Sequence, residues 1–283
     1  MKAMVLESKG APFVLRNVAT PVLKENDVLV KLHASALNHR DYYIQQGIYP
    51  RTTYPIIIGS DGAGVVEDVG TNVSRSLIGT EVVINPSHDW GDNPNVQQKD
   101  FKVLGFPDNG TLAEYIAVPA RYIQPKPFTL TFQEAAALAL VGLTAYRALF
   151  TRAKLQPGER VLVTGIGGGV AVTALQFALA IGATVWVTSS AEEKIQKAVA
   201  MGASGGVNYS VPTWGDELRK RAVGFDVIVD GAAGQGFATL LDVAAPAGRI
   251  VVYGSVGGKI QNAEAARLFW KQLSILGSTM GTE

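Results

Sequence analysis

The stretch Val161-Leu-Val-Thr-Gly165-Ile-Gly167-Gly168-Gly169-Val170-Ala171 places a run of β-branched residues before a cluster of glycines. An apolar segment follows it, and a second β-type run, Thr184–Ser189, comes next. This order predicts a strand, a tight turn, a helix and a second strand, which form one βαβ unit. Unpaired N–H groups at a helix N-terminus attract anions, and glycines let a pyrophosphate approach the backbone. The stretch therefore predicts a dinucleotide site that includes Gly165, Gly167, Gly168, Gly169 and Val170.

The end of the second strand indicates which dinucleotide binds. Folds that prefer NAD carry an acidic residue about 20 positions after the turn, where it binds the ribose 2′-hydroxyl. Here the strand ends in Thr188-Ser189-Ser190 without an acid, and Lys194 follows. Hydroxyl groups and a lysine favour a 2′-phosphate, so we predict that NADPH binds in preference to NADH. Glu193 is predicted to form a capping box with Ser190, at the start of a helix that runs to Met201.

Length, charge and cysteine content narrow the class of protein. The 283 residues suggest about two domains, and the net charge of +1 is spread without a basic stripe that would indicate nucleic acid or a membrane surface. Cysteine is absent, which excludes disulfides and thiolate zinc sites. The first seven residues are too poor in apolar side chains for a signal peptide, and the longest apolar stretch, 135–146, is shorter than the roughly 20 residues that span a bilayer. We expect a cytoplasmic protein.

The two halves of the chain differ in pattern. Residues 1–120 show short β runs separated by glycine and proline, which predicts a β-rich, barrel-like domain. Residues 121–283 alternate strand and helix patterns, which predicts a doubly wound parallel sheet. Ligands bind beyond the carboxyl ends of such strands, and the predicted ends include Ser189, Tyr209 and the pair Tyr253-Gly254.

Five short motifs occur in an order typical of one family. They are Asn38-x-x-Asp41, Gln46-Gly-Ile-Tyr49-Pro, Gly59-Ser-Asp-Gly-Ala-Gly64, Gly110-Thr-Leu-Ala-Glu114-Tyr115 and Gly142-Leu-Thr144. With them the chain resembles the medium-chain dehydrogenase/reductase superfamily, and most closely its zinc-free quinone oxidoreductase and enoyl reductase branch. The resemblance implies an α/β protein, in which a Rossmann doubly wound parallel sheet joins a β-rich GroES-like barrel domain. It also suggests a C-terminally shortened form, because relatives continue for several tens of residues and return to the barrel.

The departures from the family pattern concern metal. Zinc alcohol dehydrogenases carry a Cys and a His where this chain has Asn38 and Ser60, and the counterpart of their structural zinc lobe, residues 85–104, has no cysteine. A catalytic zinc needs about three protein ligands. The histidines of the chain stand at no ligand position of the family pattern, and they are His33, His39 and His88. We therefore predict that the protein holds no metal.

The resemblance also implies roles for single residues. Tyr49 matches the tyrosine that donates a proton in enoyl-thioester reductases of this superfamily, while Asn38 either polarises a substrate carbonyl or orients the nicotinamide ribose. Thr144, expected before the apolar helix, would contact the carboxamide end of the cofactor. Tyr209 would lie near the adenosine 2′-phosphate, together with Ser189 and Lys194. Asp41 is expected to be a structural partner.

These observations predict a zinc-independent oxidoreductase that transfers hydride from NADPH to a quinone, an enone or a similar activated carbonyl. Two alternatives stay open: an enoyl-thioester reductase, and a protein that binds NADPH without catalysis. The terminal strand, 273–277, is short and apolar, and its open edge predicts a homodimer.

Overall fold

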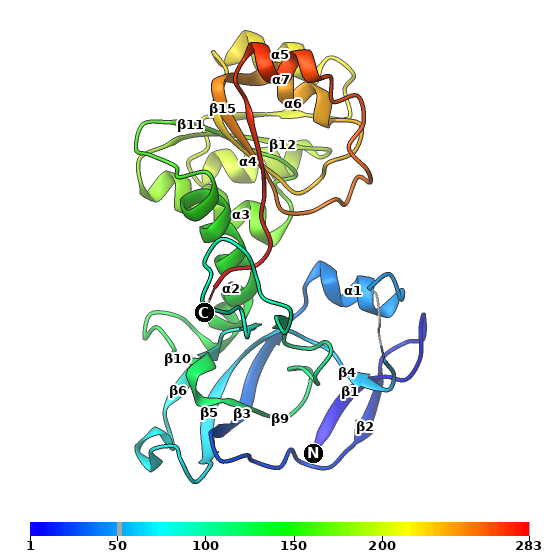
Figure 1. Ribbon diagram of the computed structural model, residues 1–283, viewed down its shortest axis with the longest axis vertical. Helices are drawn as coiled ribbons and strands as arrows, with labels where there is room; N and C mark the ends of the chain where they lie inside the picture. Colours follow the sequence, from blue (N-terminus) through cyan, green and yellow to red (C-terminus); the bar gives the residue numbers. More distant parts are fainter. Residues whose placement is uncertain (50–52, 283) are drawn as a thin grey trace. The chain divides into compact units, whose positions relative to one another are not determined.

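The computed structural model describes residues 1–49 and 53–282, which divide into two compact units (Figure 1). The barrel unit comprises Met1–Leu140 together with Thr282, and the sheet unit comprises Val141–Gly281. The division lies inside one helix, α2 (Phe132–Tyr146), and not at the expected boundary after residue 120. The reason is that the segment after residue 120 still packs on the barrel, where Ala135 and Ala136 contact Ala63.

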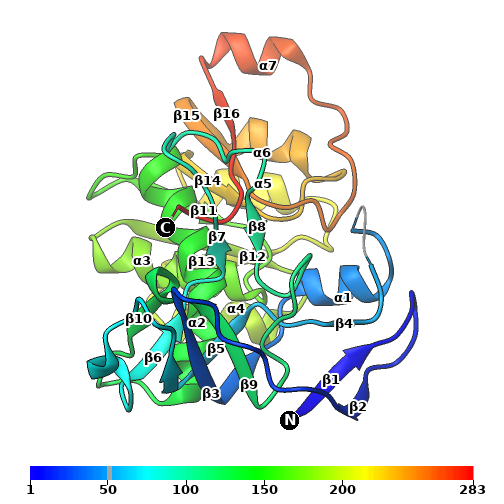
Figure 2. The same ribbon diagram turned by 60° about the horizontal axis from the view of Figure 1, so that its bottom comes forward.

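The barrel unit is built from antiparallel strands. Its main sheet has the order β10-β6-β5-β3-β9, beside a smaller sheet of order β2-β1-β4 and the pair β7-β8 (Figure 2). The bounds of these strands are β1 Lys2–Leu6, β2 Val14–Asn17, β3 Asp27–Ala36, β4 Ile56–Ile57, β5 Asp61–Val69, β6 Glu81–Ile84, β7 Ser87–His88, β8 Lys102–Val103, β9 Tyr115–Pro119 and β10 Ile123–Pro125. Alternate valines of β3, Val28 and Val30, point into a core with Ile116 and Val118 of β9. The period-2 pattern of the sequence therefore fixes which face of β3 is buried.

One helix of the barrel unit, α1 (His39–Gln45), lies within the half that was predicted to consist of short β runs. The backbone N–H of Asn38 donates to the Asp41 carboxylate over 2.7 Å, which supports the first turn of this helix. Two single-turn 3₁₀ segments complete the unit, Arg75–Leu77 (η1) and Ala120–Tyr122 (η2).

The sheet unit contains one parallel sheet of order β13-β12-β11-β14-β15-β16. Its strands are β11 Arg160–Val163, β12 Thr184–Ser189, β13 Gly205–Asn208, β14 Phe225–Asp230, β15 Ala244–Val252 and β16 Ser274–Gly277. Its helices are α3 Gly169–Ala180, α4 Glu192–Ala200, α5 Trp214–Arg221, α6 Phe237–Val243 and α7 Ala265–Trp270. The strand order reverses at β11, as in a doubly wound nucleotide-binding fold. The predicted Rossmann sheet and β-rich barrel are thus confirmed.

Both faces of this sheet are covered. Val161 and Val163 of β11 pack in the core that α3 and α4 help to form, while Leu162 between them packs with α5 and α6. In Figure 1 these two pairs of helices lie on opposite sides of the strands. Burial on both faces explains why the strands read as continuous apolar runs.

The helix α2 continues into a π-helical turn, Arg147–Arg152 (η3). The combined helix of 21 residues is long and apolar enough to cross a membrane by length and composition alone. Half of its most apolar window is buried inside the protein, as in the core helix of a globular fold. A single helix of this kind is weak evidence for a membrane span.

Candidate active site

The glycine turn lies between β11 and α3, as predicted. Gly165 has a φ of +63°, which favours glycine, and the helix begins after Gly168. A Cβ atom at Gly169 would lie 2.9 Å from the Val141 side chain, so this glycine lets α3 pack closely on α2. The turn therefore offers helix N–H groups and close backbone access, and both suit a pyrophosphate.

A lysine from the next helix crosses this turn. A Cβ atom at Gly167 would lie 2.8 Å from Lys194 Nζ and 2.9 Å from its Cδ, so the lysine side chain rests on the glycine. An ammonium group beside the positive end of a helix is favourable when an anion lies between them. The arrangement fits a phosphate group of a dinucleotide, and the implied role of Lys194 stays a prediction.

The end of β12 differs in detail from the expectation. Ser189 is buried, and its hydroxyl accepts the backbone N–H of Ala191 over 3.2 Å. Ser190 is exposed, while Tyr209 after β13 is 47% exposed. Among the hydroxyl groups at the strand end, the exposed Ser190 is therefore better placed than the buried Ser189 for contact with a 2′-phosphate.

The capping box expected at Ser190 is absent. The helix α4 starts at Glu192 with Ala191 as its N-cap, and no side chain caps it. Glu193 instead forms an ion pair with Lys197 one turn along the helix, at 2.6 Å. The prediction of a Ser190–Glu193 box was wrong, because the carboxylate pairs forward along α4 and does not reach back to the chain before it.

The ends of β14 and β15 meet around one aspartate. The buried Asp230 accepts the Thr164 hydroxyl over 2.7 Å and the N–H of Ala233 over 2.9 Å. Burial, and then the charge of Asp230, raises the pKa of Tyr253 to about 12. Cβ positions at Gly231 and Gly254 would crowd Tyr253 Oη and the Gly231 carbonyl, at 2.5 and 2.9 Å. Thr164, Tyr253 and Gly254 thus form a tightly packed edge beside the glycine turn.

Thr144 lies inside α2, near its end, and not before the apolar helix as expected. It is buried, and its hydroxyl lies 4.0 Å from the sulfur of Met280, which is also buried. The position is compatible with the implied cofactor contact, which stays a prediction.

A second polar cluster lies in the barrel unit, where α1 meets the start of β5. Asn38 Nδ2 donates to the Asp61 carboxylate over 2.8 Å, and the other oxygen of Asp61 accepts the backbone N–H of Leu140 over 2.8 Å. Because a carboxylate accepts hydrogen bonds, the bond fixes the Asn38 amide with its nitrogen toward Asp61. The Asn38 carbonyl oxygen is then an acceptor that takes part in the capping box with the Asp41 backbone N–H, and its second lone pair suits a ribose hydroxyl better than a substrate carbonyl.

Arg40, from the first turn of α1, occupies the centre of this cluster. Its Nη1 donates to Ser60 Oγ over 2.5 Å and to the Leu104 carbonyl over 2.8 Å. Its guanidinium carbon lies 5.3 Å from the centre of the Tyr49 ring. Tyr49 also meets Phe106 edge-on, with ring centres 6.1 Å apart, at the margin of a small apolar core. The structure thus brings Tyr49 and Ser60 together around Arg40, and Asn38 bonds to Asp61, the residue after Ser60.

The two aspartates of the cluster are both buried. Burial raises the pKa of Asp41, against the opposing hydrogen bond from Asn38 and the charge of Arg40. Burial likewise raises the pKa of Asp61 to about 7, where the bonds from Asn38 and Leu140 oppose the shift and the charge of Asp41 adds to it. Perturbed carboxyl groups of this kind gather at functional sites.

Glycines hold the loop before Asp61 in place. Gly59 has a φ of +100°, and a Cβ atom at Gly110 would lie 2.0 Å from the Gly59 carbonyl oxygen. Beside them the Thr111 hydroxyl donates to the Asp61 carbonyl over 2.7 Å. The two glycine motifs of the sequence therefore meet here, and together they position Ser60 and Asp61.

The cluster does not fit a catalytic zinc ion. The Asn38 amide and the Ser60 hydroxyl replace stronger ligands, and the guanidinium of Arg40 bonds directly to Ser60. A metal cation at Ser60 would lie beside this positive charge. Within residues 1–49 and 53–282, no three His, Cys, Asp or Glu side chains gather closely enough to hold a metal ion.

Each of the three histidines contacts an aromatic ring. His33 stacks on Phe132 with ring centres 4.6 Å apart, and His39 lies 4.8 Å from the ring of Tyr43. His88 stacks on Tyr122 at 3.8 Å, and burial lowers its pKa to about 4. The first two are thus aromatic neighbours, and His88 belongs to a buried stack in the lobe 85–104.

Comparison with known proteins identifies the family. Residues 24–128 match the alcohol dehydrogenase GroES-like domain, and residues 169–283 match the zinc-binding dehydrogenase model. The chain belongs to the medium-chain dehydrogenase/reductase superfamily. It is therefore an oxidoreductase by family.

Two relatives are named for different activities. A zinc-type alcohol dehydrogenase-like protein, YogA, of Leptosphaeria maculans is 37% identical over 267 residues, which cover 89% of this chain and 75% of the relative. Human quinone oxidoreductase is 31% identical over 286 residues, which cover 99% of this chain and 80% of the relative. A zinc-type relative from Schizosaccharomyces pombe is 38% identical, and the match spans 62% of its length.

Solved structures share the fold closely. An NAD-dependent alcohol dehydrogenase is 37% identical with a TM-score of 0.94, over 99% of this chain and 85% of that one. An alcohol dehydrogenase from Pyrobaculum aerophilum with bound cobalt and zinc is 27% identical with a TM-score of 0.87, over 99% and 84% of the two chains. Family members therefore include metal-binding proteins, and the side chains of this chain decide its own chemistry.

Proposed function

We propose that this protein is a zinc-independent oxidoreductase that reduces a quinone, an enone or a similar activated carbonyl with NADPH. The observation that carries the proposal is the chemistry of the cluster around Arg40. Where zinc enzymes of the family hold their metal, this chain has an amide tied to Asp61 and a hydroxyl tied to Arg40. These groups bind and orient by hydrogen bonds, and they leave the reduction to the cofactor.

NADPH would be held by the glycine turn, by Lys194, and by Ser190 and Tyr209 beside it, and it supplies the hydride. Negative charge then develops on the acceptor, on a carbonyl oxygen or its α-carbon, and needs a proton or a hydrogen-bond donor. Tyr49 supplies that proton from its hydroxyl, and Asn38 orients the nicotinamide ribose through its carbonyl oxygen. Asp61 keeps the Asn38 amide in that orientation.

The first test is NADPH oxidation with a panel of quinones and enones in the presence of a chelator. We expect turnover that the chelator leaves intact, and elemental analysis without stoichiometric zinc. One zinc per chain, with activity lost on chelation, would overturn metal independence. Cofactor binding without turnover on any acceptor would favour the non-catalytic alternative.

Replacing Tyr49 by Phe tests the proton donor and the substrate class together. General acid catalysis contributes about a hundredfold to ten-thousandfold, so we expect a loss of that size in turnover with unchanged NADPH affinity. Quinone reduction tolerates the change better, because a hydroquinone anion takes its proton from water. A larger loss with an enoyl thioester than with a quinone would favour the enoyl-thioester reductase reading.

The preference for NADPH has its own test at Lys194. A charge-assisted bond to phosphate is worth about 1.5–3 kcal/mol, so Lys194→Ala should weaken NADPH binding by about ten- to hundredfold and leave NADH nearly unchanged. Lys197→Ala is the matched control, because Lys197 stands on the same helix and pairs with Glu193. Equal weakening of both cofactors would assign Lys194 to the pyrophosphate and contradict its part in the preference.

The proposal includes a cytoplasmic homodimer. Among residues 1–49 and 53–282, β16 ends the parallel sheet and pairs only with β15, and Ile275 on it is 40% exposed. An open edge with an apolar side chain is a natural pairing surface. Light scattering at micromolar concentration should give the mass of two chains, and a monomer mass would contradict this part.

A further inference from the structure

Arg40 has an unusual environment for a buried charge. It is 9% exposed, and among the described residues no carboxylate oxygen lies within 4.0 Å of its guanidinium nitrogens. A guanidinium stays charged in proteins, and burial without a counter-ion is costly. Asp41 and Asp61 are buried nearby and their charges interact with that of Arg40, but the bonds of its Nη1 go to Ser60 and Leu104 and not to a carboxylate.

The guanidinium faces Tyr49. Its carbon lies 5.3 Å from the ring centre, within the range in which a cation is attracted to an aromatic face. On another side the ring meets Phe106 edge-on, at an interplanar angle of 76°. The tyrosine ring is thus held between a cation and an aromatic edge.

The arginine itself is anchored on two other segments. Nη1 bonds to Ser60 Oγ, just before β5, and to the carbonyl of Leu104 after β8. Both bonds come from Nη1, whose two N–H groups lie in the guanidinium plane, so together they fix the orientation of that plane, which a flexible lysine does not do. The orientation of Tyr49 is thereby coupled to the loop that carries Ser60.

We propose that Arg40 is a positioning residue for Tyr49, which holds the ring so that its hydroxyl points at the acceptor during proton transfer. This inference rests on the proposed function, since it gives Arg40 a part in the step that Tyr49 performs. A misplacement of about 1 Å at a reacting group can cost about a hundredfold in rate. The effect of Arg40 on turnover should therefore vanish when the Tyr49 hydroxyl is absent.

A double-mutant cycle with Arg40→Lys and Tyr49→Phe tests this coupling. We expect Arg40→Lys to lower kcat about tenfold in the wild-type background and less than twofold in the Tyr49→Phe background. KM for the acceptor and the Kd for NADPH should stay within twofold, because positioning acts on the chemical step. Arg40→Gln, which keeps a donor for Ser60 without the charge, should lower kcat further and lose its effect in the same background.

Arg121→Lys is the matched control. Arg121 lies 4.7 Å from the ring centre of Tyr122 and has the same kind of cation–ring contact away from the cluster. Its replacement should leave kcat within twofold. Urea unfolding of every variant shows whether it is folded, and where Arg40→Gln is not, the cycle with Arg40→Lys decides.

The outcomes separate the two claims. Equal fold losses for Arg40→Lys in both backgrounds, or no loss in either, would overturn the positioning role and leave the proposed function standing. With an enone as the acceptor, a Tyr49→Phe variant with full turnover would overturn the proton donor and, with it, the role of Arg40. The expected non-additive pattern supports both.

Discussion

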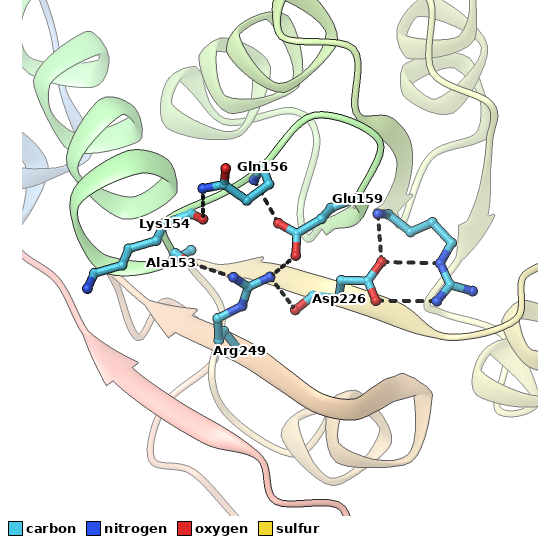
Figure 3. Close-up of polar contacts among 7 residues, drawn as sticks. Ala153, Lys154, Gln156, Glu159, Asp226 and Arg249 are labelled. Carbon is cyan, nitrogen blue, oxygen red and sulfur yellow. Dashed lines mark hydrogen bonds and ion pairs between the residues drawn. The ribbon is translucent and has the colours of Figure 1, made fainter.

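The two polar networks, one in each unit, differ in whether their charged side chains form ion pairs. In the sheet unit, Asp226 receives two side-chain bonds from Arg160, and Glu159 pairs with Arg249 (Figure 3). In the barrel unit, Arg40 has no carboxylate partner within ion-pair distance among the described residues, while Asp41 and Asp61 are buried near it. The first network pairs its charges, and the second leaves them apart.

The pKa values of the aspartates follow this difference. Burial acts to raise the pKa of Asp226, but the hydrogen bonds and charge of Arg160 outweigh it and lower the pKa. For Asp61, burial dominates and the pKa rises to about 7. Each network leaves one arginine Nε without a partner, in Arg40 and in Arg249, so an orphan atom alone does not mark a site. The pairing of opposite charges distinguishes the structural network from the candidate active site.

The largest expected effect concerns stability. The contributions of Asp61 and Asp226 to the free energy of unfolding should change with pH in opposite directions. The folded protein binds the Asp61 proton more tightly than the unfolded chain, whose ordinary pKa is 3.8. The contribution of Asp61 to the free energy of unfolding therefore falls as pH rises from about 4 to about 7. Asp61→Asn should remove this slope, a change on the order of a few kcal/mol across the window.

Asp226→Asn is the control with the opposite sign. The lowered pKa of Asp226 stabilises the fold above its ordinary pKa, and this contribution is lost as pH falls below about 4. The variant should be less stable than wild type at pH 7 and approach it in acid. Urea unfolding at several pH values measures both slopes, and the same slope in wild type and Asp61→Asn would contradict the raised pKa.

A smaller effect is expected when the paired network is broken. Arg249→Met leaves Glu159 without its partner and removes the bond to the Ala153 carbonyl at 2.9 Å. We expect the free energy of unfolding to fall by about 1–3 kcal/mol. The Kd for NADPH and kcat should stay within twofold, because the network lies at the start of β11 and the glycine turn at its end. A tenfold loss of turnover in a folded variant would show that the paired network also affects catalysis, which would contradict the distinction between the two networks.

The smallest effect is expected outside both networks, at Ser190. Loss of an N-cap side chain usually costs about 0.5–2 kcal/mol, but Ser190 does not cap α4. Ser190→Ala should therefore change the unfolding free energy by less than about 0.3 kcal/mol. A loss of about 1 kcal/mol in thermal or urea unfolding would indicate that Ser190 does cap α4, as the sequence predicts.

The sequence predicts the sheet unit well because its signals are local. The strand Thr184–Ser189 matches β12 in both bounds, and the glycines after β11 stand where a turn and a helix N-terminus require them. Apolar runs and glycine turns report on neighbours in the chain, so one sequence suffices to find them. The helix α1 has no such pattern, because seven residues with polar and aromatic side chains show little periodicity.

The barrel cluster was predicted only in part. Asn38 and Tyr49 were found through motifs, whereas Arg40 and Asp61 lie within the same motifs and were not singled out. Their importance comes from burial and from contacts between distant segments, such as the bond from Leu140 to Asp61. No local pattern encodes these contacts, although an arginine directly before the motif aspartate, Asp41, is a usable signal.

The most direct test of hydride transfer by this chain is reduction of an enone with NADPH that carries deuterium at the transferable position of C4. Mass spectrometry of the product locates the deuterium. The account predicts one deuterium on the β-carbon, with the α-hydrogen taken from the solvent-exchangeable pool and the yield unchanged by chelator. A product without deuterium, or reduction that requires added zinc, would contradict it.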